Sequence, residues 1–114
     1  MNYLDNYEKW IASDALSTYD KNELINIKND TKELEDRFYR DLEFGTAGMR
    51  GVLGIGTNRM NIYNVRHATA GVVAYVNNAG PDAAKKGVLI GYDTRIMSRE
   101  FAEETAKVLA NANI

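Results

Sequence analysis

The sequence predicts an α/β layered domain that follows a helical N-terminal extension. The first 41 residues are polar and carry apolar side chains at helical spacing, whereas composition changes at Leu42, where a glycine-rich segment begins. A helical pattern, a short apolar run, a polar loop and a second helical pattern come after that segment. This order is typical of helices that cover a sheet. We therefore divide the chain into an extension, residues 1–41, and an α/β domain, residues 42–114.

Three helices are expected in the extension. The first has one apolar face at spacings of three and four, made of Tyr3, Tyr7, Trp10 and Ile11. Asp20 with Glu23 resembles a capping box that starts a second helix, and Asp30 with Glu33 repeats the pattern for a third. The many charged residues between these apolar positions are interpreted as solvated helix faces.

Two helices and one strand are predicted in the second half. Asn64 is expected to cap a helix whose buried stripe comprises Val65, Ala68, Val72, Val76 and Ala79. Asn77–Asp82 reads as a helix stop and turn, and Gly87–Tyr92 as a short buried strand. Ser98 is expected to cap the last helix, with an inner face of Phe101, Thr105, Val108, Leu109 and Ala112.

A second strand is implied within residues 42–53, and Asn111–Ile114 reads as a helix stop followed by the first residue of another strand. A sheet with so few strands is incomplete. The sequence therefore favours a chain that stops within its fold.

Composition narrows the possible functions. The chain has 114 residues, a net charge of -2 and no cysteine, which excludes disulfides, thiolate catalysis and cysteine-bound zinc. The charge gives no footprint for nucleic acid, and no apolar run approaches the about 20 residues of a membrane span. The first residues lack the basic and apolar regions of a signal peptide. We expect a cytoplasmic protein without nucleic-acid or membrane partners.

The glycine-rich segment is the first candidate site. Five glycines fall in twelve positions from Gly45 to Gly56, and acidic residues are absent from Gly45 to Asn61. Amide donors and guanidinium groups in such a loop suit a phosphate ester. The candidate side chains are Thr46, Arg50, Thr57 and Arg59. The alternative is a glycine-rich hairpin with surface arginines, and the pattern leaves both open. Neither the dinucleotide fingerprint nor the P-loop fits.

The second candidate site follows the predicted strand. Asp93 and Arg95 come directly after it, where α/β folds bind ligands, and Arg95 is the likelier of the two to face a crevice. His67 is the only histidine and has no partner for metal binding, so a structural role is favoured. None of the three serines has the setting of a nucleophile, and no aspartate cluster suits magnesium.

Three blocks of sequence resemble the α-D-phosphohexomutase family, the phosphoglucomutase/phosphomannomutase enzymes. Phe44-Gly-Thr-Ala-Gly-Met-Arg-Gly51 is similar to the family's N-terminal signature, and Gly56-Thr-Asn-Arg-Met-Asn61 looks like the branch of bacterial phosphoglucomutases and phosphopentomutase-like enzymes. Gly91-Tyr-Asp-Thr-Arg95, followed by Ser98, resembles the next block. The resemblance implies that residues 42–114 are part of a three-layer α/β/α domain with a mixed sheet, domain 1 of the enzyme, ending before the phosphoserine loop.

The resemblance also implies a reaction. Such enzymes interconvert hexose 1-phosphate and hexose 6-phosphate, with glucose favoured here, through a phosphoserine and a bisphosphate intermediate. They require Mg²⁺ and a hexose bisphosphate activator. The expected partners are a sugar phosphate and the remaining domains of the same enzyme. Because the catalytic serine and the magnesium ligands are expected after Ile114, these residues alone should be inactive. The resemblance implies that the loop that selects the sugar is not among these residues, so the sequence does not establish which sugar is preferred.

The resemblance assigns few roles within this chain. Arg50 matches the signature arginine, expected in the catalytic cleft near the phosphoserine, and Thr46 would shape the same wall. Arg95 matches an arginine close to the phosphoserine loop. Asn58 and Arg59 belong to the branch signature without a defined role. Two alternatives remain: a self-standing phosphate- or nucleotide-binding α/β module, and a protein-interaction piece that uses the aromatic N-terminal helices.

Overall fold

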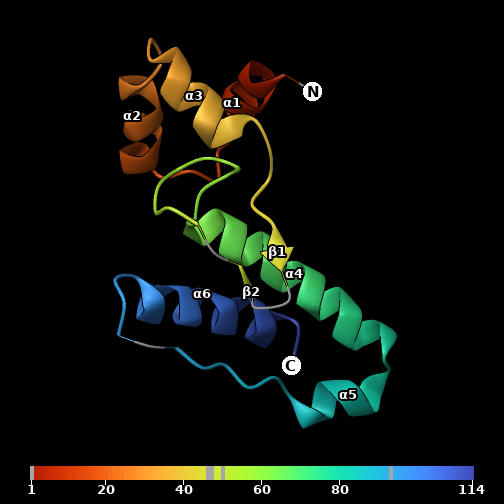
Figure 1. The fold of residues 1–114 in the computed structure, drawn as a ribbon. Coiled ribbons are helices and arrows are strands. Elements are labelled where there is room, and N and C mark those ends of the chain that lie inside the picture. Colours follow the sequence, from red (N-terminus) through yellow and green to blue (C-terminus); the bar gives the residue numbers. More distant parts are fainter. Residues whose placement is uncertain (1, 46–47, 50, 93) are drawn as a thin grey trace. The chain divides into compact units, whose positions relative to one another are not determined.

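The computed structural model describes residues 2–45, 48–49, 51–92 and 94–114, with the backbone alone at 44–45 and 48–49. The chain forms two compact units, Met1–Asn61 and Ile62–Ile114. The first holds three helices and a short hairpin, and the second holds three further helices (Figure 1). The first unit therefore combines the predicted extension with the glycine-rich segment.

Helices α1 (Tyr3–Ile11), α2 (Thr18–Asn26) and α3 (Thr31–Phe38) build most of the first unit. The predicted cap of α3 is confirmed, because Asp30 accepts a hydrogen bond from the Glu33 amide at 3.2 Å. The predicted start of α2 at Asp20 is wrong. Ser17 caps that helix by accepting from the Asp20 amide at 3.1 Å, so Asp20 lies in the first turn. A serine hydroxyl three residues upstream takes the role that the sequence pattern gave to Asp20.

The core of the first unit centres on Phe38 and Leu24, both fully buried. Tyr7 and Trp10 of α1 each meet the Phe38 ring edge-on, with centroids 5.7 and 5.9 Å away. The Tyr7 hydroxyl also donates to the Leu24 carbonyl at 3.0 Å. Burial in this core raises the pKa of the Tyr7 hydroxyl above its usual value. The aromatic face predicted for α1 is thus the surface that packs on α3.

The sheet in the described residues is a single hairpin. Strands β1 (Phe44–Gly45) and β2 (Gly48–Met49) are antiparallel, with Phe44 opposite Met49. The strand predicted at Gly87–Tyr92 is not formed, so the mixed sheet expected for this fold class is not seen in the described part of the chain. A buried strand needs a paired edge and a covered face. Leu89, at its centre, is 98% exposed.

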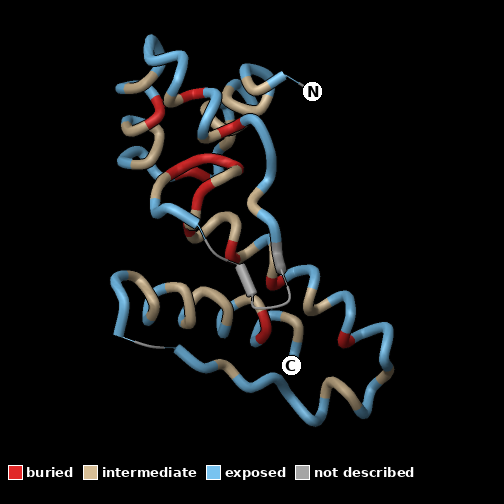
Figure 2. The backbone as a smooth tube through the Cα atoms, in the orientation of Figure 1, coloured by how far each residue is buried: buried red, intermediate tan, exposed pale blue. Residues whose placement is uncertain are grey.

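The second unit contains α4 (Ile62–Asn78), α5 (Pro81–Lys86) and α6 (Ser98–Asn111). Helix α4 packs against both others. The predicted inner faces are largely confirmed: Val65 and Val76 of α4 and Leu109 of α6 are buried, although Ala79 is exposed. Figure 2 colours the chain by burial in the orientation of Figure 1, with the buried positions in red. Within the described ranges, no helix is long and apolar enough to cross a membrane.

The ends of these helices differ in detail from the prediction. Helix α4 begins at Ile62, two residues before Asn64, the expected cap. Met97, in the left-handed conformation with φ of 70°, precedes α6, and Ser98 is its first helical residue. Helix α5 was not predicted; it begins with Pro81, whose fixed φ suits a first helical position. Local sequence placed these boundaries only to within a few residues.

Candidate functional site

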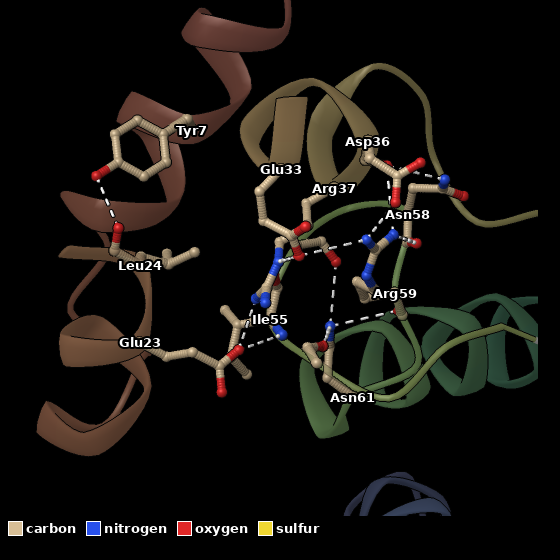
Figure 3. A network of polar contacts seen from close by, with 12 residues as sticks. Tyr7, Glu23, Leu24, Glu33, Asp36, Arg37, Ile55, Asn58, Arg59 and Asn61 are labelled. Carbon is tan, nitrogen blue, oxygen red and sulfur yellow. Dashed lines mark hydrogen bonds and ion pairs between the residues drawn. The ribbon is translucent and has the colours of Figure 1, made fainter. Parts of the chain in front are cut away.

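The best-defined polar site is the loop of residues 51–61, which we call the bracing loop. It follows the β1–β2 hairpin and is bound to α2 and α3 (Figure 3). Its buried members are Gly56 and four residues with side chains, Ile55, Thr57, Arg59 and Asn61, each of these four at most 9% exposed. Three of these four side chains are polar, so the loop is buried through hydrogen bonds rather than through an apolar face.

Ile55 is held by its main chain. The Glu23 carboxylate accepts from the Ile55 amide at 3.0 Å, and Nη1 of Arg37 donates to the Ile55 carbonyl at 3.1 Å. The same Nη1 lies 2.7 Å from the Glu23 carboxylate. An ion pair between α2 and α3 thus satisfies both backbone groups of one loop residue.

Arg37 is bound by two carboxylates. Its Nε donates to Glu33, one helical turn earlier, at 2.8 Å, while Nη1 donates to Glu23. Burial lowers the pKa of the Arg37 guanidinium, but the hydrogen bonds to Glu33 and Glu23 outweigh it, so that the pKa lies above its usual value. A guanidinium so occupied is a structural cation.

Arg59 is likewise committed to α3. Its side chain is 7% exposed, and Nη2 forms an ion pair with the Asp36 carboxylate and lies 3.7 Å from that of Glu33. Nη1 donates to the carbonyls of Asp36 and Asn58 at 3.3 and 3.0 Å. Of the two interpretations left open for this loop, a phosphate-binding role is not supported for Arg59: its charge is already balanced by carboxylates, and these donors bind protein acceptors.

Thr57 is also structural. Its hydroxyl donates to the carbonyl of Arg40 at 2.7 Å and lies 3.3 Å from that of Arg37, while the Thr57 carbonyl accepts from the Leu42 amide at 2.8 Å. Thr57 therefore joins the bracing loop to the residues that lead into β1. Of the two interpretations left open, a phosphate-binding role is not supported for Thr57, because its hydroxyl donates to a backbone carbonyl.

Asn58 and Asn61, from the same block, hold the loop in shape. The Asn58 amide donates to the Arg37 carbonyl at 2.8 Å, and its side chain donates to the Asp36 carbonyl at 3.1 Å. The Asn61 side-chain amide donates to the carbonyl of Gly54 at 2.9 Å and that of Gly56 at 3.1 Å. Asn61 thus closes the loop across its own width.

Gly56 is required by close backbone approach. A Cβ at this position would lie 2.8 Å from the Arg37 carbonyl oxygen and 2.9 Å from the Arg37 Cβ. Its φ of 147° is also one that other residues rarely adopt. This glycine therefore allows close contact between the loop and α3.

The other predicted site residues lie elsewhere. Thr46 and Arg50 fall outside the described residues, as does Asp93. Arg95 belongs to the second unit, where it is exposed and its carbonyl accepts from the Ser98 amide at 3.1 Å. His67 is exposed on α4. In the described ranges, no group of three histidine or acidic side chains could hold a metal ion.

Sequence reasoning missed Glu23 and Arg37 as partners of the loop. The Glu33–Arg37 spacing of four is a visible helical signal for an ion pair. Glu23 and Arg37, however, are separated by 14 residues, and Glu23 and Ile55 by 32. No local pattern reports contacts at those separations.

A family model described as phosphoglucomutase/phosphomannomutase, alpha/beta/alpha domain I, matches residues 41–114. The chain is 44% identical over 73 residues to the phosphoglucomutase of Staphylococcus saprophyticus, covering 64% of this chain and 13% of that protein. It is 36% identical over 111 residues to the phosphoglucomutases of Staphylococcus aureus strains bovine RF122 and USA300, covering 88% of this chain and 20% of each. No solved structure gave a significant match.

The chain thus spans a fifth or less of the length of these relatives. The family match includes the hairpin, the bracing loop and the whole second unit. It also includes the signature segment Phe44–Gly51 on which the resemblance was first based. The chain belongs to the phosphoglucomutase/phosphomannomutase family, and residues 41–114 belong to its α/β/α domain I.

Proposed function

We propose that these residues are part of a phosphohexomutase that interconverts hexose 1-phosphate and hexose 6-phosphate, with glucose preferred, through a phosphoserine and a bisphosphate intermediate. The observation that carries this proposal is the signature segment Phe44–Gly51, which lies inside the region matched by the family model. Two further blocks that resemble the family follow it in the expected order. The activity is that of the whole protein. These residues alone are expected to be inactive.

Arg50 is the proposed catalytic residue of this chain. A guanidinium beside the transferred phosphoryl group would balance its charge and hold it through paired hydrogen bonds. Thr46 would shape the same wall of the cleft, and Arg95 would bind phosphate. The occupied carboxylate partners of Arg37 and Arg59 support this choice by elimination, because those two guanidinium groups already have counterions.

Mg²⁺ and a hexose bisphosphate activator are proposed for the whole enzyme. The metal would balance negative charge on the transferring group when bound. We propose no magnesium ligand among the residues of this chain. Sugar phosphate and the remaining domains are the proposed partners, and we place the protein in the cytoplasm.

A chimera tests the function directly. Residues 41–114 would replace the matching segment of the Staphylococcus saprophyticus phosphoglucomutase, with which the chain shares 44% identity. Conversion of glucose 1-phosphate to glucose 6-phosphate is then measured with Mg²⁺ and a bisphosphate activator. An active chimera that loses about a hundredfold or more in kcat on Arg50→Ala supports the proposal. A folded but inactive chimera contradicts it.

The 114-residue chain is assayed alongside. Mutase activity in this chain by itself would overturn the expectation that the rest of the enzyme is required. Tight binding of sugar phosphates or nucleotides by the isolated chain, together with an inactive chimera, would favour the alternative of a self-standing phosphate-binding module.

A further inference from the structure

The bracing loop is hydrogen-bonded to the residues just ahead of the signature segment, and directly after the segment it closes on itself. At the leading end, Thr57 accepts from the Leu42 amide at 2.8 Å and donates to the Arg40 carbonyl. At the trailing end, the Met60 amide donates to the Val52 carbonyl at 2.8 Å, and the Gly54 amide donates to the Met60 carbonyl at 3.2 Å. The chain on either side of the β1–β2 hairpin is therefore held by hydrogen bonds that involve this one loop.

The loop in turn depends on α2 and α3. Glu23 and Arg37 hold the main chain of Ile55, and the carbonyl of Arg37 accepts from the Asn58 amide at 2.8 Å. Arg37 thus contacts the loop with its side chain on one side of Gly56 and with its backbone on the other. A side chain at position 56 would clash with Arg37, so the absence of a Cβ allows the loop to approach α3 closely here.

We propose that Arg37, paired with Glu23, is a positioning residue for the signature segment: it fixes the bracing loop and, through it, the backbone that leads into and out of the segment carrying Arg50. The proposal rests on the proposed function for its catalytic consequence. It also assigns the N-terminal helices a role, because Glu23 lies on α2 and Arg37 on α3, both ahead of the matched domain.

The chemistry explains why an arginine–glutamate pair suits this task. Arg37 donates to Glu33, Glu23 and Ile55 from a planar group with fixed directions, so that its position determines that of the Ile55 carbonyl. Lysine would keep the charge but could not reproduce this fork. Glutamine at position 23 would keep an acceptor for the Ile55 amide while removing the ion pair. Arg37→Lys therefore tests the hydrogen-bond geometry at constant charge, and Glu23→Gln tests the charge while an acceptor is kept.

The first test uses the 114-residue chain and amide NMR. In Arg37→Lys and Glu23→Gln, the resonances of Ile55 should shift together with those of Gly45 and Gly48, while those of α4 and α6 stay in place. Arg99→Lys is the matched control, because it alters an exposed arginine–glutamate pair on α6. If Arg37→Lys fails to fold, Glu23→Gln decides. Unchanged Gly45 and Gly48 resonances in a folded variant overturn the proposal.

The second test uses the whole parent enzyme, which contains the N-terminal helices as well as residues 41–114. It is assayed for phosphoglucomutase activity. Arg37→Lys should lower kcat by about tenfold to a hundredfold, as expected for a small displacement of a catalytic group, with KM changed by less than about twofold. A purely structural role would lower the folded fraction and leave kcat per folded molecule unchanged, which contradicts positioning. If the parent enzyme shows no mutase activity, the proposed function fails, while the NMR result still decides whether Arg37 positions the hairpin.

Discussion

The bracing loop and the described residues of segment 87–96, which are 87–92 and 94–96, are both irregular backbone, yet their environments are opposite. Ile55 and Arg59 in the loop are each 6% exposed, whereas Leu89 and Ile96 in the segment are 98% and 82% exposed. The loop carries polar side chains and glycines, and the segment carries the apolar run that sequence patterns favour for burial. Specific hydrogen-bond partners, and not hydrophobicity alone, therefore determine which of these irregular segments is buried.

The largest effect is expected from Gly56→Ala, which would disrupt the packing of the bracing loop against α3. A methyl group would meet the backbone of Arg37 at 2.8 Å and would require an unfavourable φ, so the first unit should lose roughly 2–5 kcal/mol of unfolding free energy. Urea unfolding followed by the fluorescence of Trp10, the single tryptophan, reports on this unit.

Gly71→Ala is its control. Gly71 lies within α4 with open space around its Cβ position, and alanine there should stabilise the second unit by about 0.5–1 kcal/mol. Equal stability of the Gly56→Ala variant and the parent chain would show that the loop does not rest on α3 as described.

Thr57→Val tests how much the buried hydrogen bonds of the bracing loop contribute to stability. The change keeps the shape but removes the donor to the Arg40 and Arg37 carbonyls, and should cost about 1–3 kcal/mol. Thr94→Val, in the exposed segment, is the matched control and should change stability by less than about 0.5 kcal/mol. The same urea titration, with circular dichroism added for Thr94, distinguishes them. Similar losses of stability at both positions would contradict the claim that the buried hydrogen bonds of Thr57 stabilise the loop.

A smaller effect is expected from pH in the second unit. Nε of Arg66 donates to Glu104 at 2.8 Å, and this hydrogen bond holds the pKa of Glu104 below its usual value. Ionised Glu104 therefore stabilises the folded state above an unfolded pKa of about 4.3, and this contribution is lost as pH falls through the lower folded pKa. Its size should be under about 1 kcal/mol, because Arg66 is partly solvated.

Unfolding followed by circular dichroism at pH 6 and at pH 3 measures how the stability of the folded state depends on pH. Glu104→Gln should lessen the loss of stability on acidification, whereas Glu103→Gln, on the exposed side of α6, should alter it less. An identical acid response in Glu104→Gln and the parent chain would contradict the assignment.

The smallest effect is expected at Leu89. Because its side chain is 98% exposed, Leu89→Ser should change the unfolding free energy by less than about 0.5 kcal/mol. Thermal unfolding followed by circular dichroism checks this. A loss near the several kcal/mol typical of a core leucine would mean that the segment is buried after all.

Sequence patterns predicted what depends on neighbours along the chain. The Asp30 cap and the Val65, Val76 and Leu109 positions follow from spacings of three or four residues, and the structure confirms them. The start of α2 was misplaced because Ser17 and Asp20 both offer a capping oxygen, and local sequence does not decide between them. The family, too, was recognised from ordered blocks and is confirmed by the match over residues 41–114.

Contacts between distant residues could not be predicted in this way. Arg59 among glycines fits a phosphate loop as well as it fits an ion pair with Asp36, because the carboxylate lies 23 residues away in sequence. The apolar run at Gly87–Tyr92 fits a strand, but pairing requires a second strand that the run itself does not specify. The roles of Thr46, Arg50 and Arg95 remain predictions that rest on the resemblance.

The way in which Ile55 is held has a consequence for how this family can vary. Glu23 and Arg37 bind only its amide and carbonyl, so they place no demand on the identity of residue 55 beyond its fit in the core. Positions 23 and 37 constrain each other instead: losing Arg37 would remove the cation paired with Glu23, and losing Glu23 would leave Arg37 with Glu33 alone and the Ile55 amide without this acceptor. Among relatives that retain the N-terminal helices, these two positions should therefore change together, while residue 55 drifts among apolar types.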